Sequence, residues 1–389
     1  MLLSLTAYGS FIESTLGTAV VNDATASYFN PAALVLLKNP QFIPQETFAH
    51  FHTQFTGRST LLATNTSESG RSSSNTGVHS PSFYLGVPAT SNIVVGLAIV
   101  SNAANRNAEE NSILRYVQAN NTIQDYDVVP ALALKINEFL SIGAGVNFSY
   151  AKFNAQPIIG FPGSNIADSQ SSNKSDGSGL GFNAGFLFKA SPTTLLGFNY
   201  RSMTTYGLSG TSIYEGNPRV VSNNYHFKLR TPARSVFSIN HFFTDKLGLI
   251  STIQYIQWSA ITQVHVYGVA NLLGTQPTIL NGSIPYYLRD TWLATLGSHY
   301  RITPKWVLRL ASTFSQSAGN PHYQIDTGDS IVVGASMGYE INKMITIDGS
   351  YAHVLIQNEN IAIAGPRYII QGVNKGSREA VSLKLTFNL

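Results

Sequence analysis

The last ten residues of the chain, Ala380 to Leu389, read AVSLKLTFNL. Small or polar residues in this stretch alternate with apolar ones, and the apolar set is Val381, Leu383, Leu385, Phe387 and Leu389. Successive side chains of a strand point to opposite faces, so the alternation predicts a β-strand with one apolar face and one small, polar face. The pattern recurs over residues 139–150, 181–189 and 330–341. The fold is therefore expected to be all-β.

The composition indicates that the apolar strand faces contact lipid. Only 11% of the 389 residues are charged, while 43% are hydrophobic and 11% aromatic. A soluble β-protein of this length would carry more charge, and the chain has no run of 18 apolar residues that could form a membrane-spanning helix. We therefore expect a transmembrane β-barrel, apolar outside and polar inside. The basic residues are scattered singly, so no nucleic acid partner is expected despite the net charge of +4.

The connections alternate in length. Short polar turns are expected at 137–138, 190–193, 244–245, 303–304 and 342–343, and long polar loops at 103–124, 154–178, 207–224, 268–285, 316–329 and 357–377. Short turns on one side and long loops on the other are typical of outer-membrane barrels. Counting segments predicts about 14 antiparallel strands over residues 41–389, with both chain ends on the periplasmic side. Aromatic residues beside the short turns are expected to form an interfacial girdle: Phe139, Phe188, Phe242, Phe243, Tyr300, Trp306 and Tyr339.

The segment before the first strand, residues 22–40, reads NDATASYFNPAALVLLKNP and does not alternate. Asn30 can cap a short helix, and Pro31 suits its first position because proline lacks the N–H that would be unpaired there. One or two helical turns cannot fold alone, so residues 1–40 are expected to pack inside the barrel as a small hatch that plugs the lumen. Residues 1–7 are similar to the end of a signal peptide, so the true start is expected to lie upstream.

The order of residues in this segment, D-A followed by N-P-A-A-L, an apolar run and N-P, resembles the N-terminal hatch of the outer-membrane long-chain fatty acid transporters (the FadL/TodX type). Other segments resemble the family in the same order along the chain: VGLAIVSN at 95–102, GFNAGFLFKA and LLGFNYRS within 181–202, YIQWSAI at 255–261, LRDTWLATLGSHY at 288–300 and YAH at 351–353.

The resemblance implies passive uptake of long-chain fatty acids or similar hydrophobic compounds across the outer membrane of a Gram-negative bacterium. Hatch residues Asn30, Pro31 and Ala32 would gate the lumen. A kink at Ser101, Asn102 and Ala103 would open the wall for lateral exit. A monomer is expected, inserted by the barrel assembly machinery and surrounded by outer-membrane lipid and lipopolysaccharide.

Some positions depart from the family pattern. The chain ends in Leu389 rather than Phe or Trp, and residues 315–321 replace the family's D-S-P-x-P loop. Where some members have basic residues for a carboxylate, this chain has Pro157 and Ile284, so Lys152 and Arg289 are the nearest candidate partners. An uncharged hydrocarbon therefore remains an alternative substrate.

Other functions are weaker interpretations. The alternative is a general outer-membrane porin or a surface adhesin, and an acyl hydrolase is a distant third. The G-x-S-x-G match at 334–338 lies within an alternating strand rather than on a strand–turn–helix elbow. The dinucleotide-like glycines at 179–184 precede no helix. His50 and His52 share a strand face without a third ligand nearby. No catalytic residue, metal or cofactor is expected.

Overall fold

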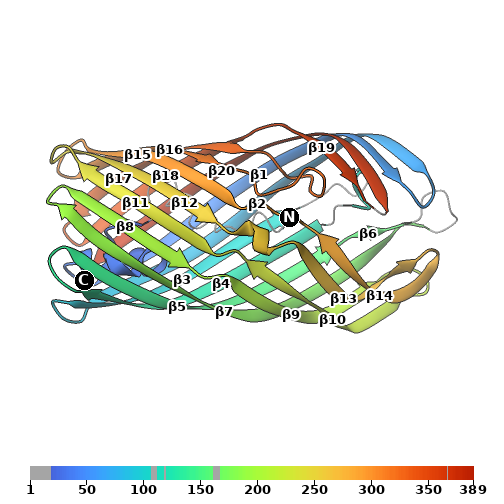
Figure 1. The fold of residues 1–389 in the computed structure, drawn as a ribbon, viewed down its shortest axis with the longest axis horizontal. Coiled ribbons are helices and arrows are strands. Elements are labelled where there is room, and N and C mark those ends of the chain that lie inside the picture. The colour runs from blue at the N-terminus through green and yellow to red at the C-terminus, as the bar shows by residue number, and fades with distance from the viewer. Residues whose placement is uncertain (1–18, 107–111, 118–119, 161–166, 366) are drawn as a thin grey trace.

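The structure is a computed structural model that describes residues 19–106, 112–117, 120–160, 167–365 and 367–389. Fourteen antiparallel strands form a closed barrel (Figure 1). Ten are continuous: β1 (Gln41–Leu61), β2 (Thr66–Pro88), β3 (Ile93–Arg106), β4 (Asn120–Lys135), β5 (Leu140–Gln156), β7 (Ser169–Ser191), β16 (Trp306–Ser315), β17 (Ser330–Asn342), β18 (Ile345–Ile356) and β20 (Tyr368–Asn388). β1 pairs with β20 from Gln41↔Asn388 to Leu61↔Tyr368, which closes the wall. The predicted fold class and strand number are confirmed.

The other four strands are each interrupted. They consist of β8 (Thr194–Arg201) with β9 (Thr204–Tyr214), β10 (Val220–Thr231) with β11 (Arg234–Phe242), β12 (Leu247–Ile256) with β13 (Gln263–Leu273), and β14 (Gln276–Pro285) with β15 (Thr291–Arg301). The short strands β6 (Ile158–Ile159) and β19 (Glu359–Ala364) pair with β7 and β20.

The four interruptions lie at one height in the wall. Their flanking residues are in register across neighbouring strands, as Arg201↔Arg234, Arg234↔Ile256 and Ile256↔Thr291. Pro232 lacks an N–H and cannot continue the strand ladder, and the 3-10 turn η4 (Trp258–Ala260) replaces extended backbone between β12 and β13. Because the breaks are aligned, this part of the wall can bend and leave space on its inner side.

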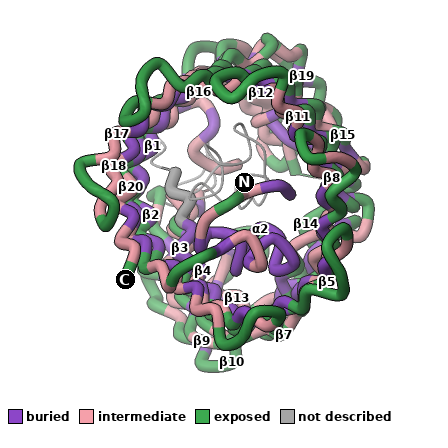
Figure 2. Tube along the Cα trace, turned by 90° about the vertical axis from the view of Figure 1, so that its left-hand side faces the viewer, coloured by how far each residue is buried: buried purple, intermediate pink, exposed green. Residues whose placement is uncertain are grey.

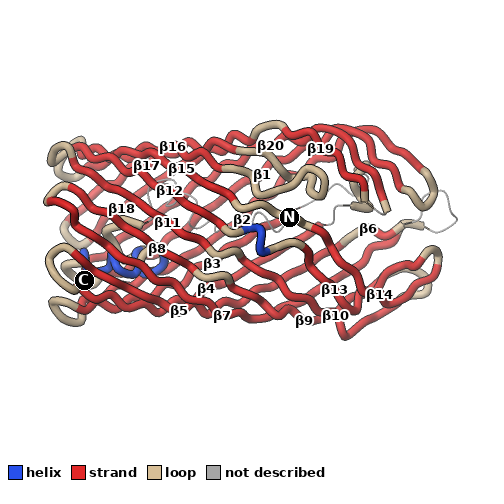
Figure 3. Tube along the Cα trace, viewed as in Figure 1, coloured by secondary structure: helices blue, strands red, loops and turns tan. Residues whose placement is uncertain are grey.

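The short-turn side matches the sequence prediction, but the long-loop side does not. Residues 207–224, 268–285 and 357–377 are mostly strand, and the connections between these strands shrink to 215–219 and 274–275 (Figure 3). Polar composition predicts loops in these ranges, but a strand whose outer face is solvated can carry polar residues there and keep its ladder hydrogen bonds. The strands therefore continue well past the apolar belt of the barrel.

The outer and inner faces follow the predicted alternation. Val381 and Leu383 are 53% and 52% exposed on the outer face, whereas Ser382 on the inner face is 3% exposed. Beside the short turns, Phe139 and Phe243 are 60% and 58% exposed. Among the described residues, no helix is long and apolar enough to cross a membrane.

Residues 19–40 lie inside the barrel near its short-turn end, where Figure 2 shows α2 within the ring of strands. They form α2 (Ala26–Phe29) and the 3-10 helix η3 (Pro31–Leu36). Phe29 and Leu34 pack with wall residues that include Ile43, Tyr84 and Leu187. Two wall glycines permit this close approach, because a Cβ on Gly143 would lie 2.3 Å from the Ala32 nitrogen and one on Gly185 would lie 2.3 Å from Asn30 Oδ1.

Candidate functional site

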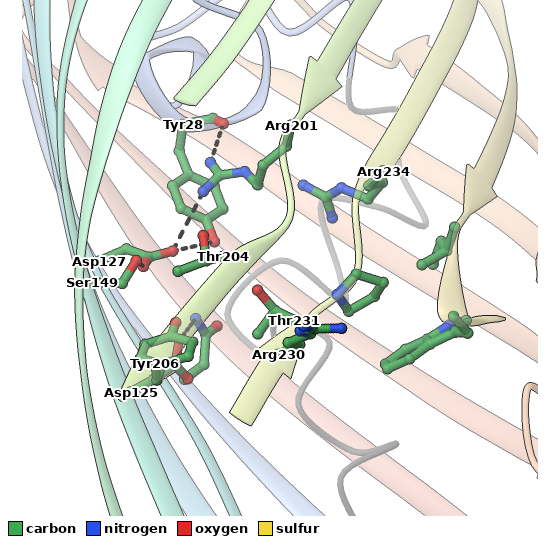
Figure 4. A pocket seen from close by; sticks show the side chains of 14 residues that line it. Tyr28, Asp125, Asp127, Ser149, Arg201, Thr204, Tyr206, Arg230, Thr231 and Arg234 are labelled. Carbon is green, nitrogen blue, oxygen red and sulfur yellow. Dashed lines mark hydrogen bonds and ion pairs between the residues drawn. The ribbon is translucent and has the colours of Figure 1, made fainter. Parts of the chain in front are cut away.

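A cavity of about 630 Å³, counting its open mouth, lies where the interrupted strands face α2 (Figure 4). The cavity is lined by one residue of the segment 19–40, by residues of β3, β4 and β5, and by residues of the interrupted strands and their breaks. They are Tyr28, Asn102, Asp125, Asp127, Ser149, Arg201, Thr204, Tyr206, Arg230, Thr231, Pro232, Arg234, Ile256 and Trp258.

One side of the cavity is the contact between the wall and residues 19–40, which are called the hatch below because the sequence predicts that role. Arg201 Nη2 donates to the carbonyl oxygen of Tyr28 at 2.9 Å, and its guanidinium lies 3.9 Å from the centre of the Tyr28 ring. Asp127 Oδ2 accepts hydrogen bonds from Tyr28 Oη at 3.1 Å and Arg201 Nη1 at 3.4 Å. The side chains of Arg201 and Asp127 are only 12% and 9% exposed. This buried pair therefore fixes Tyr28 against the wall.

The floor of the cavity is polar. Asn102 Nδ2 donates to Asp125 Oδ2 at 3.4 Å, and Ser149 Oγ donates to Asp127. Asn102 and Asp125 are 3% and 5% exposed. These side chains come from β3, β4 and β5, whose inner faces meet at this point.

Arg234 gives the cavity a second, half-buried cation. It is the ladder partner of Arg201, so two positive side chains point into the lumen from directly opposed positions. Opposed like charges destabilise a sheet pair, and Arg234 makes no ion pair with any carboxylate in the described part of the chain. Ile256, Trp258 and Pro232 supply apolar surface close by. A cation beside apolar surface can bind an amphiphile that has an anionic group.

A second ion pair joins the hatch to the wall near the short turns. Lys384 Nζ donates to Asp23 Oδ2 at 2.9 Å. Burial by itself would raise the pKa of Asp23, but the charge of Lys384 and hydrogen bonds from Thr25 outweigh it and hold this pKa below its ordinary value. Asp23 is therefore a charged anchor for the start of the described hatch.

The three predicted hatch residues lie together. The Asn30 side chain accepts from the Ala32 N–H at 3.2 Å, and its Nδ2 donates to the carbonyl oxygens of Ala19 at 2.7 Å and Phe186 at 3.1 Å. Pro31 occupies the start of η3, and Ala32 is fully buried. The predicted cap is confirmed, and it also bonds the hatch to β7.

The predicted kink residues lie where β3 leaves β2. Pairing of β2 with β3 ends at Ser82↔Val100, while pairing of β3 with β4 continues without a register shift to Arg106↔Asn121. Ser101 is 3% exposed and has outward strand parity, and Asn102 lines the cavity. Ala103 keeps its ladder partner Gln124, and its side chain lies outside the described residues.

The two predicted carboxylate partners do not lie in the cavity. Lys152 is exposed on the outer face of β5, opposite Asp176 of β7, with its Nζ 5.9 Å from the Tyr150 ring centre. Arg289 is exposed between β14 and β15, where it donates to the Ser317 carbonyl oxygen at 2.8 Å. Strand parity places Lys152 on the lipid-facing side of the wall, so proximity along the sequence did not identify the cations of the lumen.

Sequence reasoning missed the charged residues that do line the cavity. A usable signal existed, because Asp125, Asp127 and Arg201 occupy inward positions of alternating strands, where small or uncharged polar residues predominate. Arg234 directly follows a Pro-Ala break. They converge only because β4, β8 and β11 belong to one closed barrel, and no local pattern in the sequence encodes that closure.

The family model for outer membrane protein transport proteins (OMPP1/FadL/TodX) matches residues 14–387. Outer membrane protein P1 of Haemophilus influenzae is 23% identical over 385 residues, covering 86% of this chain and 81% of the relative. The long-chain fatty acid transport protein of Escherichia coli O6:H1 is 22% identical over 380 residues, covering 86% and 82%. The crystal structure of a Pseudomonas aeruginosa FadL homologue superposes with a TM-score of 0.85 at 18% identity and covers 98% of both chains.

The family match spans nearly the whole chain, and the fold is that of the solved FadL homologue. The family and its structural relatives are transporters and channels rather than enzymes. The chain therefore belongs to the OMPP1/FadL/TodX family of outer-membrane transport proteins, and it is a multi-pass β-barrel of the outer membrane that transports hydrophobic compounds.

Proposed function

We propose that this transporter takes up long-chain fatty acids or closely similar acidic amphiphiles passively, with residues 1–40 acting as the hatch of a barrel formed by residues 41–389. One observation carries the choice of substrate: Arg234 points into a cavity that also has apolar walls, and it has no carboxylate ion-pair partner among the described residues. A bound carboxylate would supply the missing counter-charge. The alkyl chain would gain roughly 0.8 kcal/mol for each CH₂ buried.

Passage through the barrel requires two openings. Asn30, Pro31 and Ala32 are proposed to gate the lumen from below, since they join the hatch to the wall beside the cavity. The side of β3 that loses its β2 partner after Val100 is proposed as the exit, with Ser101, Asn102 and Ala103 at its edge. A wall position that lacks ladder bonds can widen at smaller cost than a fully paired one.

The substrate proposal is tested with purified barrel and a fluorescent fatty acid, alongside the methyl ester of the same compound. Arg234→Gln should weaken binding of the acid by about tenfold, as expected for loss of one charge-assisted hydrogen-bonded pair. Binding of the ester should not change. The matched control is Arg301→Gln, since Arg301 is exposed beside a short turn. If wild-type protein binds the ester as tightly as the acid, an uncharged hydrocarbon is the better substrate.

The porin alternative makes a different prediction. A general porin admits sugars into liposomes, whereas a barrel with residues 19–40 packed inside should not. Sugar-driven liposome swelling by the wild-type protein at the rate of an open channel would contradict the proposed hatch.

A further inference from the structure

Three basic residues gather on the outer surface of neighbouring strands, far from the cavity. They are Arg58 of β1, Arg71 of β2 and Lys375 of β20, and we call them the basic patch. All three are exposed. They have the outward parity of Phe48, Phe83 and Val381 on the same strands, so their side chains leave the barrel on its outer face.

The strand register brings the patch together. Thr56 of β1 pairs with Arg71 on one side and with Val373 on the other, while Gln54 pairs with Lys375. Arg58 pairs with Ser69, so it is a diagonal neighbour of Arg71. Sheet spacing places the Cα atoms of Arg58 and Arg71 about 8 Å apart, and those of Arg71 and Lys375 about 12 Å apart. At these separations the long side chains of the three residues can all reach a single anionic group bound over Thr56 on the outer face.

The positive charge of the patch is not compensated on that face. None of its three members forms an ion pair with a residue in the described ranges. Glu379 is four residues from Lys375 along β20, about 13 Å away, and it lies 3.4 Å from His353 Nδ1. Glu68 has the opposite parity, and Arg115 holds it with two hydrogen bonds. Lys152, by contrast, faces Asp176 across β5 and β7.

The position of the patch identifies the environment it meets. The exposed apolar residues Val381 and Leu383 of β20 lie six and eight residues from Lys375, toward the short-turn end. In an outer-membrane barrel whose short turns are periplasmic, the patch therefore lies above the acyl chains, beside the headgroups and sugars of the outer leaflet.

We propose that Arg58, Arg71 and Lys375 bind phosphate groups of the anionic glycolipid of the outer leaflet. Guanidinium groups match phosphate in a bidentate geometry, and an ammonium adds a point charge. Thr56, Ser69 and Ser73 lie on the same outer face and can donate further hydrogen bonds. The site is separate from the cavity, so it does not rest on the proposed substrate.

The test measures binding of a rough-type lipopolysaccharide to purified full-length barrel in detergent. The test variant is Arg58→Gln/Arg71→Gln/Lys375→Gln. The control variant, Lys152→Gln/Lys174→Gln/Lys228→Gln, removes the same charge from exposed positions on the opposite wall around Asp176. Heat-modifiable gel mobility verifies that both barrels are folded.

The test variant should lose about tenfold or more in affinity, and the control variant less than about threefold, if several charge-assisted bonds are removed only in the former. Enzymatically dephosphorylated lipopolysaccharide should bind wild type as weakly as native lipopolysaccharide binds the test variant. Equal losses in the two variants, or no loss after dephosphorylation, would overturn the proposal. Displacement of the glycolipid by millimolar inorganic phosphate alone would also overturn it, by indicating a general anion site.

Discussion

The guanidinium of Arg201 lies over the ring of Tyr28 with 3.9 Å between its central carbon and the ring centre, although the two residues are 173 positions apart. Arg201 belongs to the wall, Tyr28 to the hatch, and both line the cavity. A stacked cation of this kind contributes about 0.5–2 kcal/mol, and Asp127 completes the contact. A ligand in the cavity would therefore touch the same side chains that dock the hatch.

Arg201→Met should loosen the hatch. The substitution keeps an unbranched, flexible stem but removes the guanidinium and leaves Asp127 buried without its cation, which costs about 3–5 kcal/mol. Liposome swelling by small sugars should rise above the wild-type rate. Arg301→Met, at an exposed wall position, is the control. An unchanged swelling rate in Arg201→Met would mean that this contact does not hold the hatch.

Gly143→Ala should displace the hatch without damaging the wall. A Cβ at this position would lie 2.3 Å from the Ala32 nitrogen and 2.5 Å from the Pro31 carbonyl carbon, so the hatch backbone must move. Limited proteolysis should cut residues 19–40 faster than in wild type. Gly349→Ala is the matched control, because its Cβ would meet no atom within 4 Å. Equal cleavage rates in the two variants would contradict the observed packing.

The barrel could be predicted because the alternation of apolar and polar residues that marks each strand is a local pattern in the sequence. Alternation at Val381, Leu383 and Leu385 predicts the strand and its outward face, and the structure has turns at 136–139 and 343–344, within a residue of the predicted positions. The long-loop side failed for a physical reason. In β9 the outward residues Thr205, Gly207, Ser209 and Thr211 are small or polar because this part of the strand stands above the lipid, and such a segment resembles a loop in sequence.

The site was only partly predictable. Asn30 and Pro31 are recognised locally, since capping involves adjacent residues. Arg201, Arg234 and Asp127 come from β8, β11 and β4, and only barrel closure brings them together around Tyr28. Lys152 was selected by sequence position, yet an even-numbered residue on β5 faces outward.

The ion pair of Asp23 with Lys384 should make hatch docking stable to mild acid. The pKa of Asp23 is lowered in the folded protein. The stabilisation that its ion pair gives to hatch docking is therefore complete above the pKa of an unfolded aspartate, about 3.9, and is lost only as the pH falls further. Sugar flux through the wild-type barrel should therefore be constant from about pH 5 to pH 8. In Lys384→Met, Asp23 keeps its Thr25 hydrogen bonds but loses the counter-charge, so its buried carboxylate is unpaired wherever it is ionised. Flux through this variant should therefore exceed the wild-type flux near neutral pH and fall toward it in mild acid, where Asp23 takes up a proton. A flat profile in the variant would contradict this account.

Leu383→Arg should destabilise the barrel strongly. Leu383 is 52% exposed within the apolar belt of β20, and an arginine facing lipid there costs roughly 2–4 kcal/mol. Ser209→Arg is the control, since Ser209 of β9 is exposed toward the long-loop end and lies opposite Asp176. Urea unfolding in lipid vesicles should show the loss only for Leu383→Arg. Comparable destabilisation of both variants would mean that the belt has been placed wrongly.

The proposed exit can be closed reversibly with a disulfide. Extending the β2–β3 register by one step beyond Ser82↔Val100 pairs Pro81 with Ser101, and the native chain has no cysteine. Oxidised Pro81→Cys/Ser101→Cys should bind a fluorescent fatty acid normally, because Asn102 and the rest of the cavity are intact, yet its uptake should fall sharply and recover on reduction. The control pair is Ala49→Cys/Ala380→Cys, which joins β1 and β20 where they are already paired. If the oxidised exit pair is cross-linked on a gel and still imports at the wild-type rate, substrate does not leave between β2 and β3, and passage past the hatch becomes the better account.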